Sequence, residues 1–237
     1  MGHALLWQVG QVLGEVKRNT VTLKLLELFS GQGSISATFR ERGHQAYRVD
    51  WSDTVEAELH ADIGALTIKD VVELCDGLPD VVWASPQCTT YSIATHRHRT
   101  LDEGLNPKTD TAAQDDQINV AMWALIDQLI EAGTRYYFVE NPRGRMRHMP
   151  FVQGRMRHTV SYCSYGRRGN AKGYEHTYQN KPTDIWTNHD WPGFNPVCNY
   201  SRSGHEHGDW GLAAKRDYLN RGEIPKDLRD YIVTICE

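Results

Sequence analysis

Two side chains suited to covalent and acid–base chemistry, the thiol of Cys88 and the carboxyl of Glu140, each follow a short apolar run of the chain. A thiolate can add to an electron-poor ring carbon, and a carboxylic acid can donate a proton or a hydrogen bond to a ring nitrogen. A free thiol titrates near ~8.5, so Cys88 needs a helix N-terminus, a nearby arginine or a proton transfer to become reactive. Together with Asn141, these residues form the predicted catalytic set.

A second set of residues has the character of a nucleoside site. In a doubly wound sheet, ligands bind beyond the carboxyl ends of the strands, where these residues are expected. Glycines let the backbone approach a ligand, Asp50 can accept both ribose hydroxyls, and Trp51 with Ile63 can hold an adenine. The turn at 30–34 lacks the GxGxxG pattern, which favours a ligand without a pyrophosphate, although such turns also serve as packing devices. The predicted cofactor-binding residues are Phe29, Ser30, Gly31, Gly33, Asp50, Trp51, Asp62, Ile63 and Pro86.

These residues require a framework of alternating strands and helices. Short apolar runs bounded by Gly or Pro predict strands, and apolar positions at helical spacing predict helices. Their alternation predicts the α/β class, with a mostly parallel sheet and crossover helices. We expect strands at 24–29, 46–49, 80–84 and 135–139, helices ending near 43, 77 and 133, and a C-terminal helix that packs back onto the sheet.

Three motifs give the sequence a resemblance to one enzyme family. Segment 27–33 (ELFSGQG) resembles the first motif of the cytosine-5 DNA methyltransferases, 86–92 (PQCTTYS) resembles their Pro-Pro-Cys-Gln-x-Phe-Ser loop, and 140–142 (ENP) resembles their Glu-Asn-Val. The match covers roughly 24–150, and its wording is closest to compact members encoded by phages. The resemblance implies a three-layer, Rossmann-like S-adenosylmethionine-dependent methyltransferase fold. It also implies methyl transfer to carbon 5 of a cytosine that is flipped out of double-stranded DNA and held as a covalent Cys88 adduct.

The sequence also departs from the family pattern. Gln87, Thr89 and Pro142 replace family residues but leave the reactive groups in place. The later Gln-x-Arg-x-Arg motif has no clean counterpart, and the usual large target-recognition region would have to fit within 164–222. We therefore expect a catalytic domain at 1–163, a small lobe at 164–222 and a C-terminal helix at 223–237. Three alternatives stay open: an RNA acceptor, a donor that carries a bulkier group, and an inactive relic that binds DNA or cofactor.

Charge is segregated along the chain. The formal net charge is −4, yet Asp50 to Asp80 contains nine acids and one Lys, whereas Arg135 to Lys172 contains nine bases and one acid. A basic face can therefore meet phosphates despite the net charge. The polar loop at 89–113 is long enough to act as a clamp. The predicted nucleic-acid contacts are Ser92, His96, Arg97, Arg99, Arg143, Arg145 and Arg147, with an ordinary solvated basic face as the alternative for the His96 region and the Arg-Met-Arg segments.

Composition sets further expectations about location and metals. No apolar run approaches the ~18–20 residues that cross a bilayer, and the first residues lack a basic-then-apolar leader, so we expect a cytoplasmic monomer, in the host cell if phage-encoded. Five scattered cysteines predict reduced thiols rather than a disulfide framework. The spacing of Cys163, Cys198, His205 and His207 matches no standard zinc site, and we predict no metal.

Overall fold

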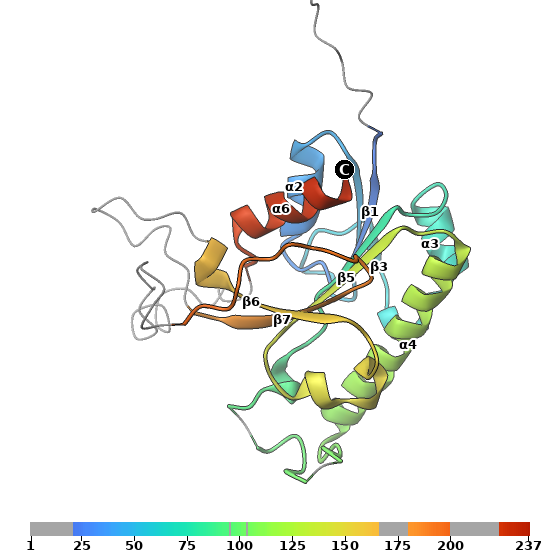
Figure 1. Cartoon of the computed structure of the whole chain (residues 1–237). Helices are drawn as coiled ribbons and strands as arrows, with labels where there is room; N and C mark the ends of the chain where they lie inside the picture. The colour runs from blue at the N-terminus through green and yellow to red at the C-terminus, as the bar shows by residue number, and fades with distance from the viewer. Residues whose placement is uncertain (1–20, 95, 103, 166–179, 200–222) are drawn as a thin grey trace, which may run out of the picture.

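The computed structural model describes residues 21–94, 96–102, 104–165, 180–199 and 223–237. Its strands form one sheet in the order β3-β2-β1-β4-β5-β7-β6, in which β7 runs in the direction opposite to the other strands (Figure 1). The carboxyl ends of the parallel strands therefore meet at one edge of the sheet. The strands are β1 (Lys24–Leu28), β2 (Gln45–Asp50), β3 (Leu59–His60), β4 (Val81–Ala84), β5 (Tyr136–Pro142), β6 (Arg157–Ser161) and β7 (Pro182–Thr187).

Helices cover both faces of this sheet and give three layers (Figure 1). Helices α2 (Ser34–Glu41) and α6 (Lys226–Cys236) pack on one face, and α3 (Ile68–Leu74) and α4 (Asp110–Ala132) pack on the other. A buried apolar cluster fills each of the two spaces between helices and sheet. Because both faces are covered, β4 is apolar and buried at every position. The predicted three-layer, Rossmann-like α/β fold is confirmed.

Local sequence signals set the ends of the helices that border the site. Thr67 caps α3 by accepting a hydrogen bond from the Asp70 N–H, and the Asp70 carboxylate accepts one from the Thr67 N–H in return. Thr109 caps α4 through the N–H of Ala112, and Gly133, with a φ of 121°, follows its last turn. Helix α4 begins at 110, within the loop predicted at 89–113, and the turn η2 (Thr89–Tyr91) occupies the start of that loop.

The structure departs from prediction mainly after residue 139. Strand β5 continues through Glu140 to Pro142, and β6 was not anticipated. Residues 182–187, expected in the small lobe, form β7 inside the main sheet between β5 and β6. Residues 166–179 and 200–222 of that expected lobe lie outside the described residues. Within the described ranges, no helix has the length and apolar character needed to span a membrane.

Candidate active site

The turn after β1 is shaped by tight backbone contacts. Gly31 and Gly33 have φ values of 48° and 67°, in the left-handed region that favours glycine, and Phe29 has a φ of 54°. A Cβ on Gly33 would lie 2.8 Å from Cδ of Arg48, so the turn packs directly against β2. The Gly33 N–H donates to the Ser30 carbonyl at 2.7 Å. The sequence-predicted turn is present, and close packing explains one of its glycines.

Asp50 ends β2 and joins that strand to the glycine turn. Its carboxylate accepts hydrogen bonds from the N–H of Gly31 at 2.9 Å and from the N–H of Ser52 at 3.0 Å. Since Asp50 is buried, these bonds fix the positions of two turns that border the site. The ribose contact predicted for Asp50 stays a prediction. The next side chain, Trp51, is 66% exposed and leaves its ring available for stacking.

A pocket of about 880 Å³ opens beside these turns, a size typical of small-molecule sites. Phe29, Trp51, Asp62, Ile63 and Pro86 line it as predicted, while the other predicted cofactor residues, Ser30, Gly31, Gly33 and Asp50, are not among its lining residues. The sequence analysis did not assign the other lining residues of this pocket to a cofactor site. The α4 members recur at helical spacing on one face, which is the signal that could have revealed them. The remaining lining residues are His60, Ala61, Gln87, Thr89, Thr90, Arg97, His98, Thr111, Gln114, Asp115, Ile118 and Asn119.

Cys88, which follows the end of β4, lies near Glu140 in β5, and these two strands are parallel neighbours in the sheet. Asn141 Nδ2 donates a hydrogen bond to the Pro86 carbonyl at 2.9 Å and so ties the Cys88 loop to β5. The charge of Glu140 acts directly on the Cys88 thiol, as expected for two groups in one site. The side chain of Glu140 is oriented by Tyr162, whose hydroxyl donates to Oε1 at 2.9 Å. Sequence reasoning assigned no role to Tyr162.

Electrostatics keep the resting thiol protonated. Although Cys88 is exposed as a residue, desolvation by the surrounding protein raises the pKa of its thiol. The negative charge of Glu140 raises this pKa further, whereas Lys181 lowers it. Burial, followed by the charge of Glu140, raises the pKa of Tyr162 well above its ordinary value, so its hydroxyl remains a donor. Nucleophilic attack by Cys88 therefore requires a change that comes with the substrate.

The segment after β5 contacts the Cys88 loop at two further points. A Cβ on Gly144 would lie 2.6 Å from the Tyr91 carbonyl oxygen, so the two backbones approach too closely for any other residue. Arg145 donates to the Ser92 carbonyl through Nη1, and its Nη2 lies 2.9 Å from His96 Nδ1. All three of these residues were predicted as nucleic-acid contacts. Arg145 instead contacts both Ser92 and His96 and so ties the loop to η3 (Arg145–His148).

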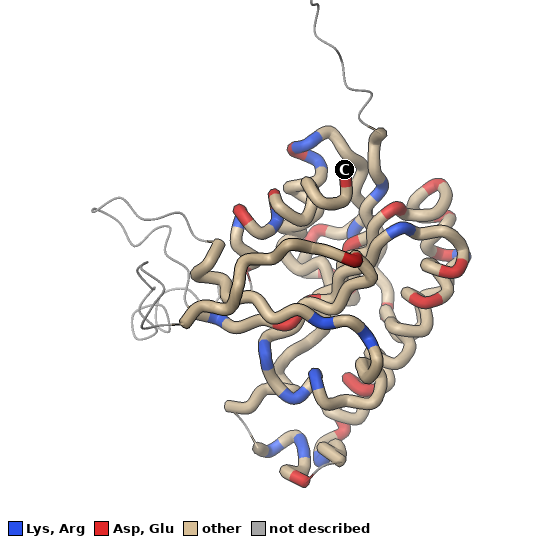
Figure 2. Tube along the Cα trace, viewed as in Figure 1, with Lys and Arg blue, Asp and Glu red and all other residues tan. Residues whose placement is uncertain are grey.

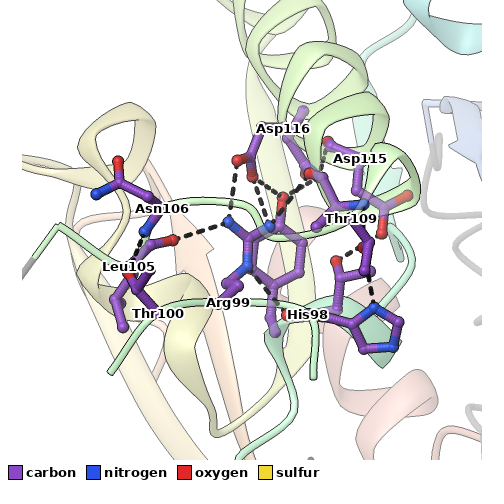
Figure 3. Close-up of polar contacts among 12 residues, drawn as sticks. His98, Arg99, Thr100, Leu105, Asn106, Thr109, Asp115 and Asp116 are labelled. Carbon is purple, nitrogen blue, oxygen red and sulfur yellow. Dashed lines mark hydrogen bonds and ion pairs between the residues drawn. The ribbon is translucent and has the colours of Figure 1, made fainter. Parts of the chain in front are cut away.

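Arg99 holds the base of the loop (Figure 3). Its guanidinium donates to the two carboxylate oxygens of Asp116 at 2.7 and 2.9 Å and lies 4.2 Å from the centroid of the Tyr91 ring. The Tyr91 hydroxyl donates to the same carboxylate at 2.7 Å. Asp116 therefore binds both ends of the segment 91–99. Arg99 is only 1% exposed, which contradicts the phosphate contact predicted for it.

Arg147 is likewise engaged within the protein. It donates to the Asp184 carboxylate through Nε at 2.9 Å and to Thr159 Oγ1 through Nη2 at 3.2 Å. These bonds hold η3 against β6 and β7, and they argue against the phosphate contact predicted for Arg147. By contrast, His96, Arg97 and Arg143 are exposed. Their predicted nucleic-acid contacts stay predictions.

One region of the described structure is rich in basic side chains. Figure 2 shows Lys and Arg along the stretch between β5 and β6 and on the loop that precedes α4, while Asp and Glu gather around α3. The expected segregation of charge along the chain is thus also a segregation in space. The exposed basic members adjoin the loop that carries Cys88.

The described residues contain no group of three or more potential metal ligands. Of the four residues considered for zinc, His205 and His207 lie outside the described ranges. Cys163 and Cys198 lie within hydrogen-bonding reach of each other, and burial followed by this contact raises the pKa of Cys163.

No protein-family model and no curated protein matches this sequence. Among solved structures, the S. pombe Dnmt2 methyltransferase is similar, with a TM-score of 0.44 and 14% identity over 86% of this chain and 57% of that one. The chain thus spans little more than half the length of that protein. A TehB-like SAM-dependent methyltransferase from Corynebacterium glutamicum has a TM-score of 0.38 and 12% identity over 78% of this chain and 94% of its own.

A third similar structure, Thermoplasma acidophilum 1320, has a TM-score of 0.34 and 10% identity over 77% of this chain and 83% of that one. Identities this low concern the fold alone. The chain has a three-layer, Rossmann-like α/β fold. What it does with that fold depends on its own residues.

Proposed function

We propose that the chain is an S-adenosylmethionine-dependent cytosine-5 methyltransferase of double-stranded DNA, of the compact kind that phages encode. The observation that carries this proposal is the meeting of Cys88 and Glu140 at the end of two neighbouring strands, beside the large pocket. A thiol nucleophile next to a carboxyl group suits this reaction, because carbon 5 of cytosine becomes nucleophilic only after a nucleophile has added at carbon 6.

The pocket residues fit the cofactor. Phe29, Trp51 and Ile63 offer apolar surface for an adenine, and Asp62 offers a carboxylate beside them. Asn119 also lines the pocket and is buried with an acceptor oxygen that has no partner among the described residues, as expected where a ligand supplies the donor. When bound, the cofactor supplies an electrophilic methyl group on a sulfonium.

The chain's residues perform the remaining steps. The Cys88 sulfur adds to carbon 6 while Glu140 protonates or hydrogen-bonds N3, which makes carbon 5 nucleophilic. Carbon 5 then takes the methyl group, and the electron pair of the broken carbon–sulfur bond stays on the departing thioether. A base removes the carbon 5 proton, Cys88 leaves, and the ring double bond re-forms. Asn141 and Tyr162 hold the Cys88 loop and the Glu140 carboxyl in register.

The acceptor is proposed to be DNA because exposed basic residues adjoin the catalytic pair. Arg97 and Arg143 are exposed; Arg97 lines the pocket together with Gln87 and Thr89, and Arg143 precedes Gly144, which packs on the Cys88 loop at Tyr91. Such side chains can bind phosphates without base readout. A target base in a duplex must leave the stack, at a cost of a few kcal/mol. In this proposal, the exposed residues Ile93, Ala94, His96 and Arg97 occupy the space near such a base.

Transfer of a labelled methyl group to cytosine-containing duplexes tests the proposal. We expect 5-methylcytosine from the wild type, none from Cys88→Ser, and normal activity from Cys198→Ser. With 5-fluorocytosine in the duplex, fluorine cannot leave as a proton does, so a covalent Cys88 adduct should persist and be visible by denaturing electrophoresis. Methylated adenine would refute the assignment. Methylated cytosine in RNA alone would favour the RNA acceptor instead. Cofactor binding without product on any acceptor would favour the inactive relic.

A further inference from the structure

The α4 side of the pocket carries two hydrogen-bond acceptors, the Asn119 side-chain oxygen and the Asp115 carboxylate, whose hydrogen-bonding capacity is not filled by the described residues. Asn119 is 1% exposed, and its Nδ2 donates to the Asp115 carbonyl at 2.8 Å and to the Tyr91 hydroxyl at 3.1 Å. Since a carbonyl can only accept, these contacts fix which end of the amide is nitrogen. The other end, Oδ1, is buried and has no partner among the described residues.

Asp115 lies one turn earlier on α4 and lines the same pocket. Its Oδ2 accepts a hydrogen bond from Thr90 Oγ1 at 2.6 Å, and no ion pair with Asp115 occurs within the described part of the chain. The charges of Arg99 and His98 act on Asp115, but the Arg99 guanidinium is already bound by Asp116. Figure 3 shows the two acids side by side on α4, with Asp116 turned to Arg99 and Asp115 turned away from it.

Burial raises the pKa of Asp115, which means that its carboxylate has lost part of its hydration without gaining a full counter-charge. A partly desolvated carboxylate and an unsatisfied amide oxygen on the same pocket wall suit a ligand group with several N–H donors and a positive charge. A primary ammonium group has both properties.

The position of this pair within the pocket narrows the ligand group further. Asp115 and Asn119 adjoin Thr90 and Tyr91, on the side of the Cys88 loop. Ile118, which lies between them in the sequence, instead packs where α4 meets Gly64 of η1 (Ile63–Ala65). This is the side of the apolar residues suited to adenine. In a sulfonium cofactor, the amino-acid portion lies on the far side of sulfur from the adenosine.

We infer that Asp115 and Asn119 form a subsite for the protonated amino group of the cofactor's amino-acid portion, an inference that rests on the proposed function. Arg97 lines the same pocket and supplies a positive charge for the neighbouring carboxylate of that portion. Together they give the pocket charges that complement a zwitterion. Neither α4 residue is required by the chemistry at the cytosine ring.

Calorimetric binding of two ligands to the full chain tests this subsite. The first ligand is S-adenosylhomocysteine, and the second is its analogue with hydrogen in place of the amino group. We expect Asp115→Asn to weaken binding of the first ligand about 10- to 100-fold and binding of the second less than about 3-fold. Asn119→Leu should show the same selectivity. Asp110→Asn removes the same charge from an exposed position of α4 outside the pocket and should leave both affinities unchanged.

The outcomes separate the subsite from the proposed function. Equal weakening of both ligands by Asp115→Asn, or no weakening of either, would overturn the subsite while leaving a cofactor-binding protein. Failure of the wild type to bind S-adenosylhomocysteine at all would overturn the proposed function and the subsite with it. Thermal melting of each variant without ligand identifies any that fails to fold, and the Asp115→Asn result then decides alone, because asparagine can still accept the Thr90 hydrogen bond.

Discussion

Replacing Gly144 with alanine brings a methyl carbon to 2.6 Å from the Tyr91 carbonyl oxygen, where ordinary contact begins at 3.4 Å. The obstacle is backbone, so no side-chain rotation relieves it. The chain after β5 must move away from the Cys88 loop by about 0.8 Å. Overpacking of this kind costs about 1–3 kcal/mol in stability. Because a displacement of about 1 Å can cost 100-fold in rate, kcat for methyl transfer should fall by roughly that factor.

The control for this prediction is Gly154→Ala. Gly154 has a φ of 77° with open space around it, so alanine there strains the backbone by about 1 kcal/mol without touching the Cys88 loop. Denaturant unfolding should show comparable losses of stability in the two variants, whereas only Gly144→Ala should lose activity. Wild-type kcat in Gly144→Ala, or equal losses of kcat in both variants, would refute the argument that this contact sets the distance between Cys88 and Glu140.

Three further changes test the site. Glu140→Gln removes a charge that raises the pKa of Cys88, so a larger fraction of the Cys88 thiol is ionised at pH 8. Iodoacetamide should therefore alkylate Cys88 several-fold faster, as measured by peptide mass spectrometry. Tyr162→Phe removes the hydrogen bond to Glu140 and should cost about 1 kcal/mol in thermal unfolding and roughly 10-fold in kcat; an unchanged kcat would contradict its orienting role. Asp116→Ala leaves Arg99 buried without its carboxylate and should cost about 3 kcal/mol, the low end for a broken buried pair because Asp116 is 21% exposed. Denaturant unfolding measures this loss, and protease cleavage between 92 and 98 should accelerate.

The first half of the fold and the central pair could be predicted because their signals are local. Strands β1, β2, β4 and β5 follow from short, largely apolar runs ended by Gly, Asp or Pro, whereas the two-residue β3 was not predicted. The rule that sites lie at strand ends predicted that Cys88 lies near Glu140. Five of the pocket residues followed from the same rule. The pocket wall on α4 was missed because only the apolar positions of that helix entered the prediction.

Strand β7 was missed because buried polar side chains break its apolar pattern. Thr183, Asp184 and Thr187 are all buried, and Asp184 is satisfied by Arg147, which lies 37 positions earlier in the sequence. Arg99 was misassigned for the same reason, since its partner Asp116 is 17 positions away. A basic residue in a polar loop has the same local appearance whether it meets a phosphate or a buried carboxylate. Only the fold brings the partner and so decides between them.

The repulsion between a Cys88 thiolate and a Glu140 carboxylate also suggests how the proposed catalytic pair becomes reactive. A thiolate at Cys88 beside an ionised Glu140 would place two negative charges in a partly desolvated site, which the raised pKa of Cys88 reflects. If the thiol proton passes to Glu140, the site keeps a single negative charge and gains both a nucleophile and a neutral acid. That acid then carries the proton that N3 of the base requires. In the proposed mechanism, this transfer occurs when substrate is bound and activates both groups at once, whereas in the free protein the charge of Glu140 only opposes the thiolate. Alkylation of the free protein at Cys88 that is slower in Glu140→Gln at every pH would instead show that Glu140 acts as the base without substrate.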